Sequence, residues 1–238
     1  MAMLYAIGDS FTYGFNFKVE QERIKSVWPN QLADLLSLPH QNLSVPGGSN
    51  WRMARLVATL PLTQDDVVII ALSDNQRFEF GVNLNHKPPE PKLPGDINEV
   101  DGNLITKRFF GALSGRTVDE KAKVLTELAF GPFFNKMWFS QMHIVMCSAI
   151  THRLQTIGCR WLMFDAWNMN PRIDIPNYIF PYSTMYDNVV QREKDEMMRY
   201  WTKEEHGQIA KIIYDKLYNN QTDQYEIYSA NTNLDWFY

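Results

Sequence analysis

Three short apolar runs are the feature that most limits how this chain can fold. They cover residues 3–7, 66–72 and 160–165, and a weaker fourth run covers 41–45. Short runs that are apolar throughout are typical of strands covered on both faces, as in a parallel sheet. Helix-like stretches separate them, over about 27–38, 50–60 and 132–157, with a last one from about residue 202. This alternation predicts an α/β fold, a three-layer sandwich around a central parallel sheet.

The length of 238 residues suits one large domain with a full core. We predict a single domain over residues 1–218, with an insertion at about 81–131 and a polar, aromatic tail over 219–238. The insertion contains the proline-rich stretch HKPPEPKLPGD, which predicts irregular chain, followed by a short helix over about 118–128. It lacks a core-sized apolar pattern, so we expect it to lie over the sheet.

Composition excludes several classes of protein. The net charge of −4 offers no basic face for nucleic acid, and no apolar run reaches the roughly 18 residues of a membrane span. No secretory signal is visible and only two cysteines occur, so we expect a reducing, cytoplasmic location. His143 and Cys147 have i, i+4 spacing, but two such residues on an apolar helix are more often core residues. We therefore expect no metal and no cofactor.

The stretch IGDSFTYG, residues 7–14, follows the first predicted strand directly. Ser10 therefore lies just beyond the carboxyl end of that strand, where open parallel sheets place their ligand sites. Gly8 and Gly14 allow tight turns around it. Asp9, Ser10 and Thr12 are also good helix N-caps, so a purely structural role is equally compatible with the local sequence.

The segment GDSFTYG resembles the GDSxTxG block of the SGNH hydrolases, also called the GDSL esterase and lipase family. The resemblance implies a flavodoxin-like three-layer fold with Ser10 as the nucleophile. The segment SVPGGSN after the second run implies that Gly47 gives an amide to the oxyanion hole, with Gly48 beside it at the substrate. The segment SDNQ after the third run implies that the Asn75 side chain completes the hole.

The three segments make chemical sense together. A serine that attacks an ester carbonyl creates an oxyanion, and losing one donor to that oxyanion costs about 10²–10³ in rate. Taken singly, Gly47 is a turn glycine and Asn75 a loop residue. All three segments in order, each after its own predicted strand, favour a hydrolase site. The chain departs from the family pattern at Ser73, where glycine is usual, and at Gln76, where aspartate is usual.

The base is harder to identify. The family places it in a DxxHP block before the last helix, followed by a second histidine and an IA pair. One register aligns His206 with that second histidine, which puts Tyr200 at the catalytic histidine and Met197 at the aspartate. A capping box, Thr202 with Glu205, supports this register. The other register makes His206 itself the base. His206 is therefore the candidate base, and Tyr200 is a candidate substrate contact.

Other titratable residues offer weaker alternatives. His40 precedes the second run, and His143 and His152 belong to a predicted helix. His86 lies in the insertion. Asp165, at the end of the third strong run, is placed either to line the cleft or to cap the next loop.

We therefore expect a serine esterase or deacetylase that hydrolyses acyl or O-acetyl esters of a carbohydrate or lipid. The alternative is a binding or structural protein that keeps the fold but has weakened chemistry. The NWR and WTKEEH segments resemble divergent SGNH-like proteins of tailed phages. That resemblance implies a phage-encoded or virion-associated role, with the aromatic tail docking on a protein partner.

Overall fold

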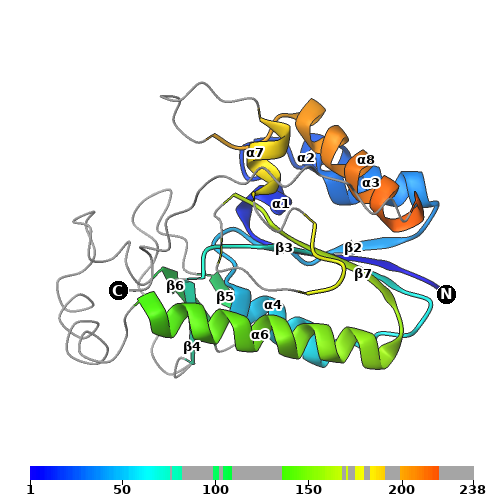
Figure 1. Ribbon diagram of the computed structural model, residues 1–238. Coiled ribbons are helices and arrows are strands. Elements are labelled where there is room, and N and C mark those ends of the chain that lie inside the picture. The colour runs from blue at the N-terminus through cyan, green and yellow to red at the C-terminus, as the bar shows by residue number, and fades with distance from the viewer. Residues whose placement is uncertain are drawn as a thin grey trace, which may run out of the picture.

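A four-stranded parallel sheet forms the centre of the computed structural model (Figure 1). The structure describes residues 1–75, 77–81, 99–101, 104–108, 136–167, 170, 175–179, 183–190 and 199–219. The strands are β1 (Leu4–Ile7), β2 (His40–Asn42), β3 (Val67–Leu72) and β7 (Arg160–Asp165), in the order β2-β1-β3-β7. This order matches the 2-1-3-4 core of flavodoxin-like sheets. The three strong runs are confirmed as strands, whereas the weak run forms only three residues and starts one residue earlier.

Two pairs of long helices cover the two faces of this sheet, as Figure 1 shows. Helices α3 (Trp28–Leu36) and α8 (Lys203–Asn219) pack together on one face, and α4 (Asn50–Thr59) and α6 (Lys136–Ile157) pack together on the other. Alternate side chains of each strand enter opposite layers, because successive residues of a strand point to opposite faces. The predicted three-layer α/β sandwich is confirmed.

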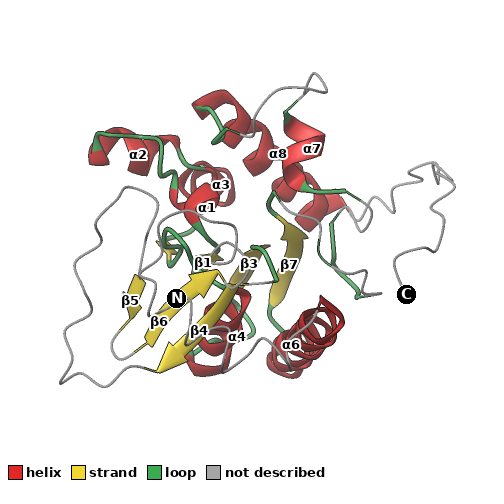
Figure 2. Ribbon diagram, turned by 90° about the vertical axis from the view of Figure 1, so that its left-hand side faces the viewer, coloured by secondary structure: helices red, strands yellow, loops and turns green. Residues whose placement is uncertain are grey.

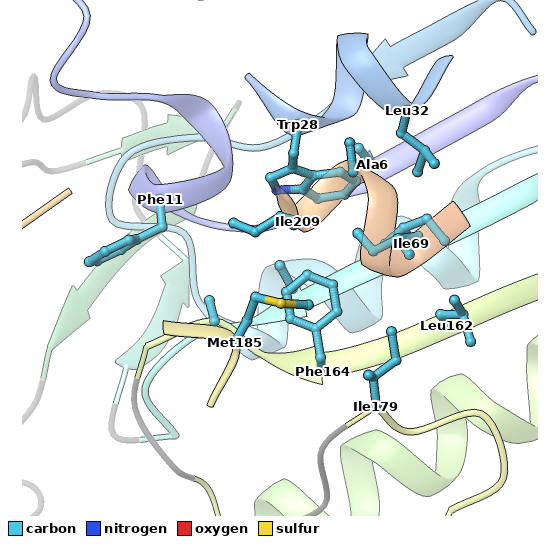
Figure 3. Close-up of a cluster of buried hydrophobic side chains, with 14 of the residues drawn as sticks. Ala6, Phe11, Trp28, Leu32, Ile69, Leu162, Phe164, Ile179, Met185 and Ile209 are labelled. Atoms are coloured by element: carbon cyan, nitrogen blue, oxygen red, sulfur yellow. The ribbon is translucent and has the colours of Figure 1, made fainter. Parts of the chain in front are cut away.

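The two cores are built from these alternating positions. Figure 3 shows the first one, where Ala6, Ile69 and Phe164 meet Trp28 and Ile209 from the helices. The second core lies under α4 and α6. Its fully buried members include Ile7, Val68, Ile70, Met53 and Leu154. The sheet is thus apolar on both sides, and its polar chemistry is confined to the strand ends.

The last helix begins at a capping box, as predicted. The Thr202 N–H donates to Glu205 Oε2 at 2.6 Å, and the Glu205 N–H donates to Thr202 Oγ1 at 3.3 Å. Arg199 adds a bidentate ion pair to the same carboxylate, at 2.7 and 2.8 Å. These bonds satisfy amides that a helix N-terminus leaves unpaired.

Three short helices were not predicted. They are α1 (Ser10–Tyr13), α2 (Glu20–Ser26) and α7 (Met185–Val189). Each is at most two turns long, so too few apolar positions recur to give a helical pattern. Helix α1 ends at Gly14, whose φ of 78° is the left-handed conformation that glycine adopts most readily.

A second sheet, antiparallel and three-stranded, joins β4 (Arg77–Gly81), β5 (Glu99–Asp101) and β6 (Leu104–Arg108) in the order β4-β6-β5 (Figure 2). Its last two strands lie inside the predicted insertion, so that region contains regular pairing that the sequence did not suggest. The strands are too short to show a clear period of two. The stretch HKPPEPKLPGD, the helix predicted over 118–128 and the tail from residue 220 lie outside the described residues, and the domain division stays a prediction.

Within the described part of the chain, no helix combines the length and apolarity that crossing a bilayer requires.

Candidate functional site

Ser10 begins helix α1 at the carboxyl end of β1. The N-cap of that helix is Asp9, whose Oδ1 accepts the Phe11 N–H at 3.0 Å. The capping role that the sequence left open therefore belongs to Asp9. Ser10 is 5% exposed, and no residue in the described part of the chain forms a hydrogen bond with its Oγ. Within the described residues, the Ser10 hydroxyl is thus not occupied by a structural bond.

The turn that contains Gly47 and Gly48 packs directly on the Ser10 turn. The Val45 N–H donates to the Gly8 carbonyl at 3.4 Å, and the Gly48 N–H donates to the Val45 carbonyl at 3.1 Å. A Cβ added to Gly48 would lie 2.9 Å from the Gly8 oxygen, so only glycine allows this approach. Gly47 has a φ of +79°, again suited to glycine. The structure therefore brings the first two predicted segments together.

The third segment follows β3 and reaches the same place. Ser73 Oγ donates to Asp9 Oδ2 at 2.9 Å, and the Ser73 N–H donates to Asn50 Oδ1 at 2.7 Å. Asn75 lies two residues further, half-buried, in the turn that the Arg77 N–H closes on the Asp74 carbonyl at 3.1 Å. The hydroxyl bond to Asp9 gives a use for serine where the family pattern has glycine.

Asp9 connects these segments. Its carboxylate is fully buried, and Oδ2 accepts from Ser73 Oγ, from Arg77 Nη1 at 3.0 Å and from Trp167 Nε1 at 2.7 Å. A buried carboxylate requires such donors, because its desolvation is costly unless it is paired and hydrogen-bonded. The sequence suggested Asp9 only as a cap, and it did not point to Arg77 or Trp167. The sequence signal that could have identified Asp9 as a buried, bonded carboxylate is its position directly after an apolar strand.

Aromatic rings surround the residue that follows Ser10. Phe11 stacks on Trp167 with a centroid distance of 5.8 Å, and the Tyr200 ring lies 4.9 Å from Phe11. Tyr200 also lies 5.7 Å from Phe15. The residue that one register aligns with the catalytic histidine is therefore close to the Ser10 turn. Met197, its partner in that register, lies outside the described residues.

His206 is buried between helices. Its Nδ1 accepts the Trp28 N–H at 3.2 Å, and its ring lies 5.5 Å from Trp201 and 5.8 Å from Phe17. Burial lowers the pKa of His206 to about 4, although Glu205 acts in the opposite direction. Because Nδ1 is an acceptor, the neutral ring carries its proton on Nε2. In the described part of the chain no hydrogen bond joins His206 to Ser10, and the bond to the Trp28 N–H gives the imidazole a structural role.

The remaining candidates have structural surroundings. His143 Nδ1 lies 3.4 Å from Asn50 Nδ2, its Nε2 lies 3.5 Å from Cys147 Sγ, and burial lowers the pKa of His143 to about 4. Burial raises the pKa of the Cys147 thiol. Asp165 Oδ2 accepts the Asn170 N–H at 3.0 Å, so Asp165 caps the next loop. Burial raises the pKa of Asp165 to about 6, partly offset by hydrogen bonds from Asn170 and Tyr178.

The described residues contain no group of three or more histidine, cysteine, aspartate or glutamate side chains that could hold a metal ion.

No family model matches the chain, and no curated protein matches it. Among solved structures, it is similar to the psychrotrophic esterase EstA from Pseudoalteromonas sp., in a structure inhibited by monoethylphosphonate. The identity is 13% over 94% of this chain and 100% of that chain, with a TM-score of 0.48. TesA shares 11% identity over 91% of this chain and 98% of its own, with a TM-score of 0.47.

A protein from Desulfitobacterium hafniense DCB-2, provisionally described as a lipolytic protein of the G-D-S-L family, shares 14% identity. The likeness covers 90% of this chain and 98% of that one, with a TM-score of 0.41. All three TM-scores lie below 0.5, so these likenesses do not establish a function for this chain.

Proposed function

We propose that this chain is a serine-dependent ester hydrolase in which Ser10 attacks the acyl carbonyl. The observation that carries the proposal is the convergence of three chain segments at one end of the sheet. Asp9 bonds Ser73 and Arg77, and the Gly48 turn packs against Gly8. Ser10 belongs to the first of these segments, and no described residue forms a hydrogen bond with its hydroxyl.

In the proposed reaction, Ser10 Oγ forms a bond to the carbonyl carbon and its proton passes to water. The amides of Ser10 and Gly47 and the side chain of Asn75 stabilise the oxyanion. The alcohol leaves, taking a proton from water, and a second water molecule then cleaves the acyl-serine. An oxyanion hole and substrate binding, without a dedicated base, still give about 10³–10⁴ over the uncatalysed rate.

His206 has no part in this scheme, because the Trp28 N–H occupies the lone pair of its Nδ1. Replacement of His206 by alanine tests its predicted role as base. Because no histidine among the described residues is hydrogen-bonded to Ser10, we expect slow turnover that rises with hydroxide concentration.

The substrate we propose is an acyl or O-acetyl ester of a carbohydrate or lipid. The support is the group of aromatic rings beside Ser10, in which Phe11 contacts both Trp167 and Tyr200. Trp167 and Tyr200 are only partly buried. Aromatic faces of this kind bind sugar rings and acyl chains through apolar contact. In this proposal Tyr200 and Gly48 are the substrate contacts.

A second candidate is a binding protein that shares the fold, which includes the phage-encoded, virion-associated role. The observation that favours it is the His206–Trp28 bond, which gives the candidate base a structural role. The two candidates differ in whether Ser10 reacts.

The experiment that separates them is labelling with a fluorophosphonate, read by intact mass, together with turnover of a short-chain aryl ester. We expect Ser10→Ala to lose both. Ser44→Ala is the matched control, because Ser44 is 3% exposed and its hydroxyl also has no hydrogen-bond partner among the described residues. If the native chain is neither labelled nor active over a range of pH, the hydrolase proposal is wrong and the binding protein remains.

A further inference from the structure

Arg77 connects the two turns between which the proposed oxyanion would form. Its Nη1 donates to Asp9 Oδ2 at 3.0 Å and to the Gly48 carbonyl at 3.2 Å. Asp9 precedes Ser10, and Gly48 follows Gly47. A single nitrogen thus joins the segment of the candidate nucleophile to the segment of the candidate oxyanion amide.

The guanidinium is itself held in place. Its Cζ lies 5.3 Å from the centre of the Trp167 ring, and Trp167 Nε1 donates to the same oxygen of Asp9. The Arg77 side chain is 13% exposed and the Asp9 side chain is fully buried. A buried, hydrogen-bonded charge pair resists displacement far more than a surface pair does.

We infer that Arg77 is a positioning residue that fixes the Gly47–Gly48 turn relative to Ser10. The inference rests on the proposed function for its catalytic consequence, but not for the bridge itself. Among the described residues, the backbone bond between the Gly48 turn and the Ser10 turn is that of the Val45 N–H to Gly8, which at 3.4 Å is long. Without Arg77, we expect the turn to move and the Gly47 amide to lose its alignment.

The consequence for catalysis follows from the geometry. Oxyanion donors act only when they point at the position that the oxygen will take. A misplacement of about 1 Å costs on the order of 10²-fold in rate. Substrate affinity in the ground state does not depend on this alignment, so the loss belongs in kcat and not in KM.

The test compares Arg77→Gln and Arg77→Lys with the native chain. Nη1 alone makes both bonds, so we expect a lysine ammonium, which has three donors, to replace them without the planar fork of arginine. We expect Arg77→Gln to lower kcat about 10²-fold with KM within twofold, and Arg77→Lys to recover most of that loss. Arg23→Gln is the matched control, since the Arg23 side chain is 14% exposed, pairs with Glu20 and contacts Tyr13 at the end of α1, so it tests loss of a half-buried guanidinium that does not bond the Gly48 turn.

A second measurement does not depend on activity. Amide hydrogen exchange at Val45 and Gly48 reports the turn directly, with Ile69 in the central strand β3 as the internal reference. We expect about tenfold faster exchange at the two turn amides in Arg77→Gln, and native rates in Arg77→Lys and Arg23→Gln. If exchange at Ile69 is faster as well, the comparison is between the turn amides and Ile69: a larger acceleration at Val45 and Gly48 supports the bridge, and an equal acceleration at all three overturns it.

The outcomes are distinct. Unchanged exchange at Val45 and Gly48 in a folded Arg77→Gln chain overturns the bridge. An unchanged kcat in an active enzyme overturns the positioning role while the proposed function stands. A native chain that does not react at Ser10 defeats the proposed function, and exchange still decides whether Arg77 holds the turn.

Discussion

The imidazole of His206 accepts a hydrogen bond from the backbone N–H of Trp28, at 3.2 Å, across 178 residues of chain. Trp28 is the first residue of α3, and Val27 before it makes no side-chain cap. A residue of α8 therefore satisfies an amide that the N-terminus of α3 would otherwise leave unpaired. The bond links two helices that cover the same face of the sheet.

Replacing His206 distinguishes this structural role from a catalytic one. In His206→Ala, the Trp28 amide is left buried without an acceptor and the core loses a ring, so we expect a loss of about 2–4 kcal/mol in the free energy of unfolding. The rate of Ser10 labelling per folded molecule should stay within a few-fold. His152→Ala, exposed on α6, is the control and should change stability by less than about 0.5 kcal/mol. A drop of more than about 10² in labelling by folded His206→Ala would instead identify His206 as the base.

Stability should fall as the pH decreases from 7 to 5. The folded pKa values of His206 and His143 are both lowered to about 4, against 6.5 when unfolded, so the unfolded chain binds more protons in that range. Asp165 opposes this, because its folded pKa is raised to about 6 from 3.8. Two histidines outweigh one aspartate, and urea unfolding should show a net loss of about 2–3 kcal/mol. Asp165→Asn should enlarge the loss, and a chain more stable at pH 5 would contradict the assignment.

Asn75 provides a test of the proposed oxyanion hole. Removing a side-chain donor in Asn75→Ala should lower kcat on an aryl ester by about 10²–10³ with KM nearly unchanged. The half-buried side chain predicts little change in stability, within about 1 kcal/mol. Steady-state kinetics and urea unfolding measure the two quantities. A proportional rise in KM with unchanged kcat would show that Asn75 contributes only to substrate binding.

The approach of the two turns can be disturbed by a single methyl group. In Gly48→Ala the new Cβ would lie 2.9 Å from the Gly8 carbonyl oxygen and 3.2 Å from the Val45 carbonyl oxygen. Both are backbone atoms, which cannot move away by a change of rotamer as side-chain atoms can. We expect a loss of about 1–3 kcal/mol in the free energy of unfolding and slower labelling of Ser10. Gly207→Ala is the comparison, because the new Cβ would meet only the carboxamide of Gln31. Equal stability and labelling in both variants would show that the close approach is not required.

Local patterns in the sequence were sufficient for the framework of the fold. Apolar runs and helical periodicity located β1, β3 and β7 and the four long helices, because strand and helix patterns repeat within a few residues. The capping box at Thr202 and Glu205 was predictable for the same reason, since its partners are three residues apart. The weak strand β2 and the one-turn helix α1 were less visible, because short elements contain too few repeats.

The sequence by itself determined that an apolar parallel sheet would place Ser10 at its carboxyl end, because burial on both faces leaves polar residues only at strand ends. Only the tertiary structure decided what Ser10 would have as neighbours. The partners of Asp9 come from Arg77, 68 residues away, and Trp167, 158 residues away, and the partner of His206 is 178 residues away. Such bonds form because a folded core must satisfy every polar group it buries, and which distant group does so depends on how the helices pack.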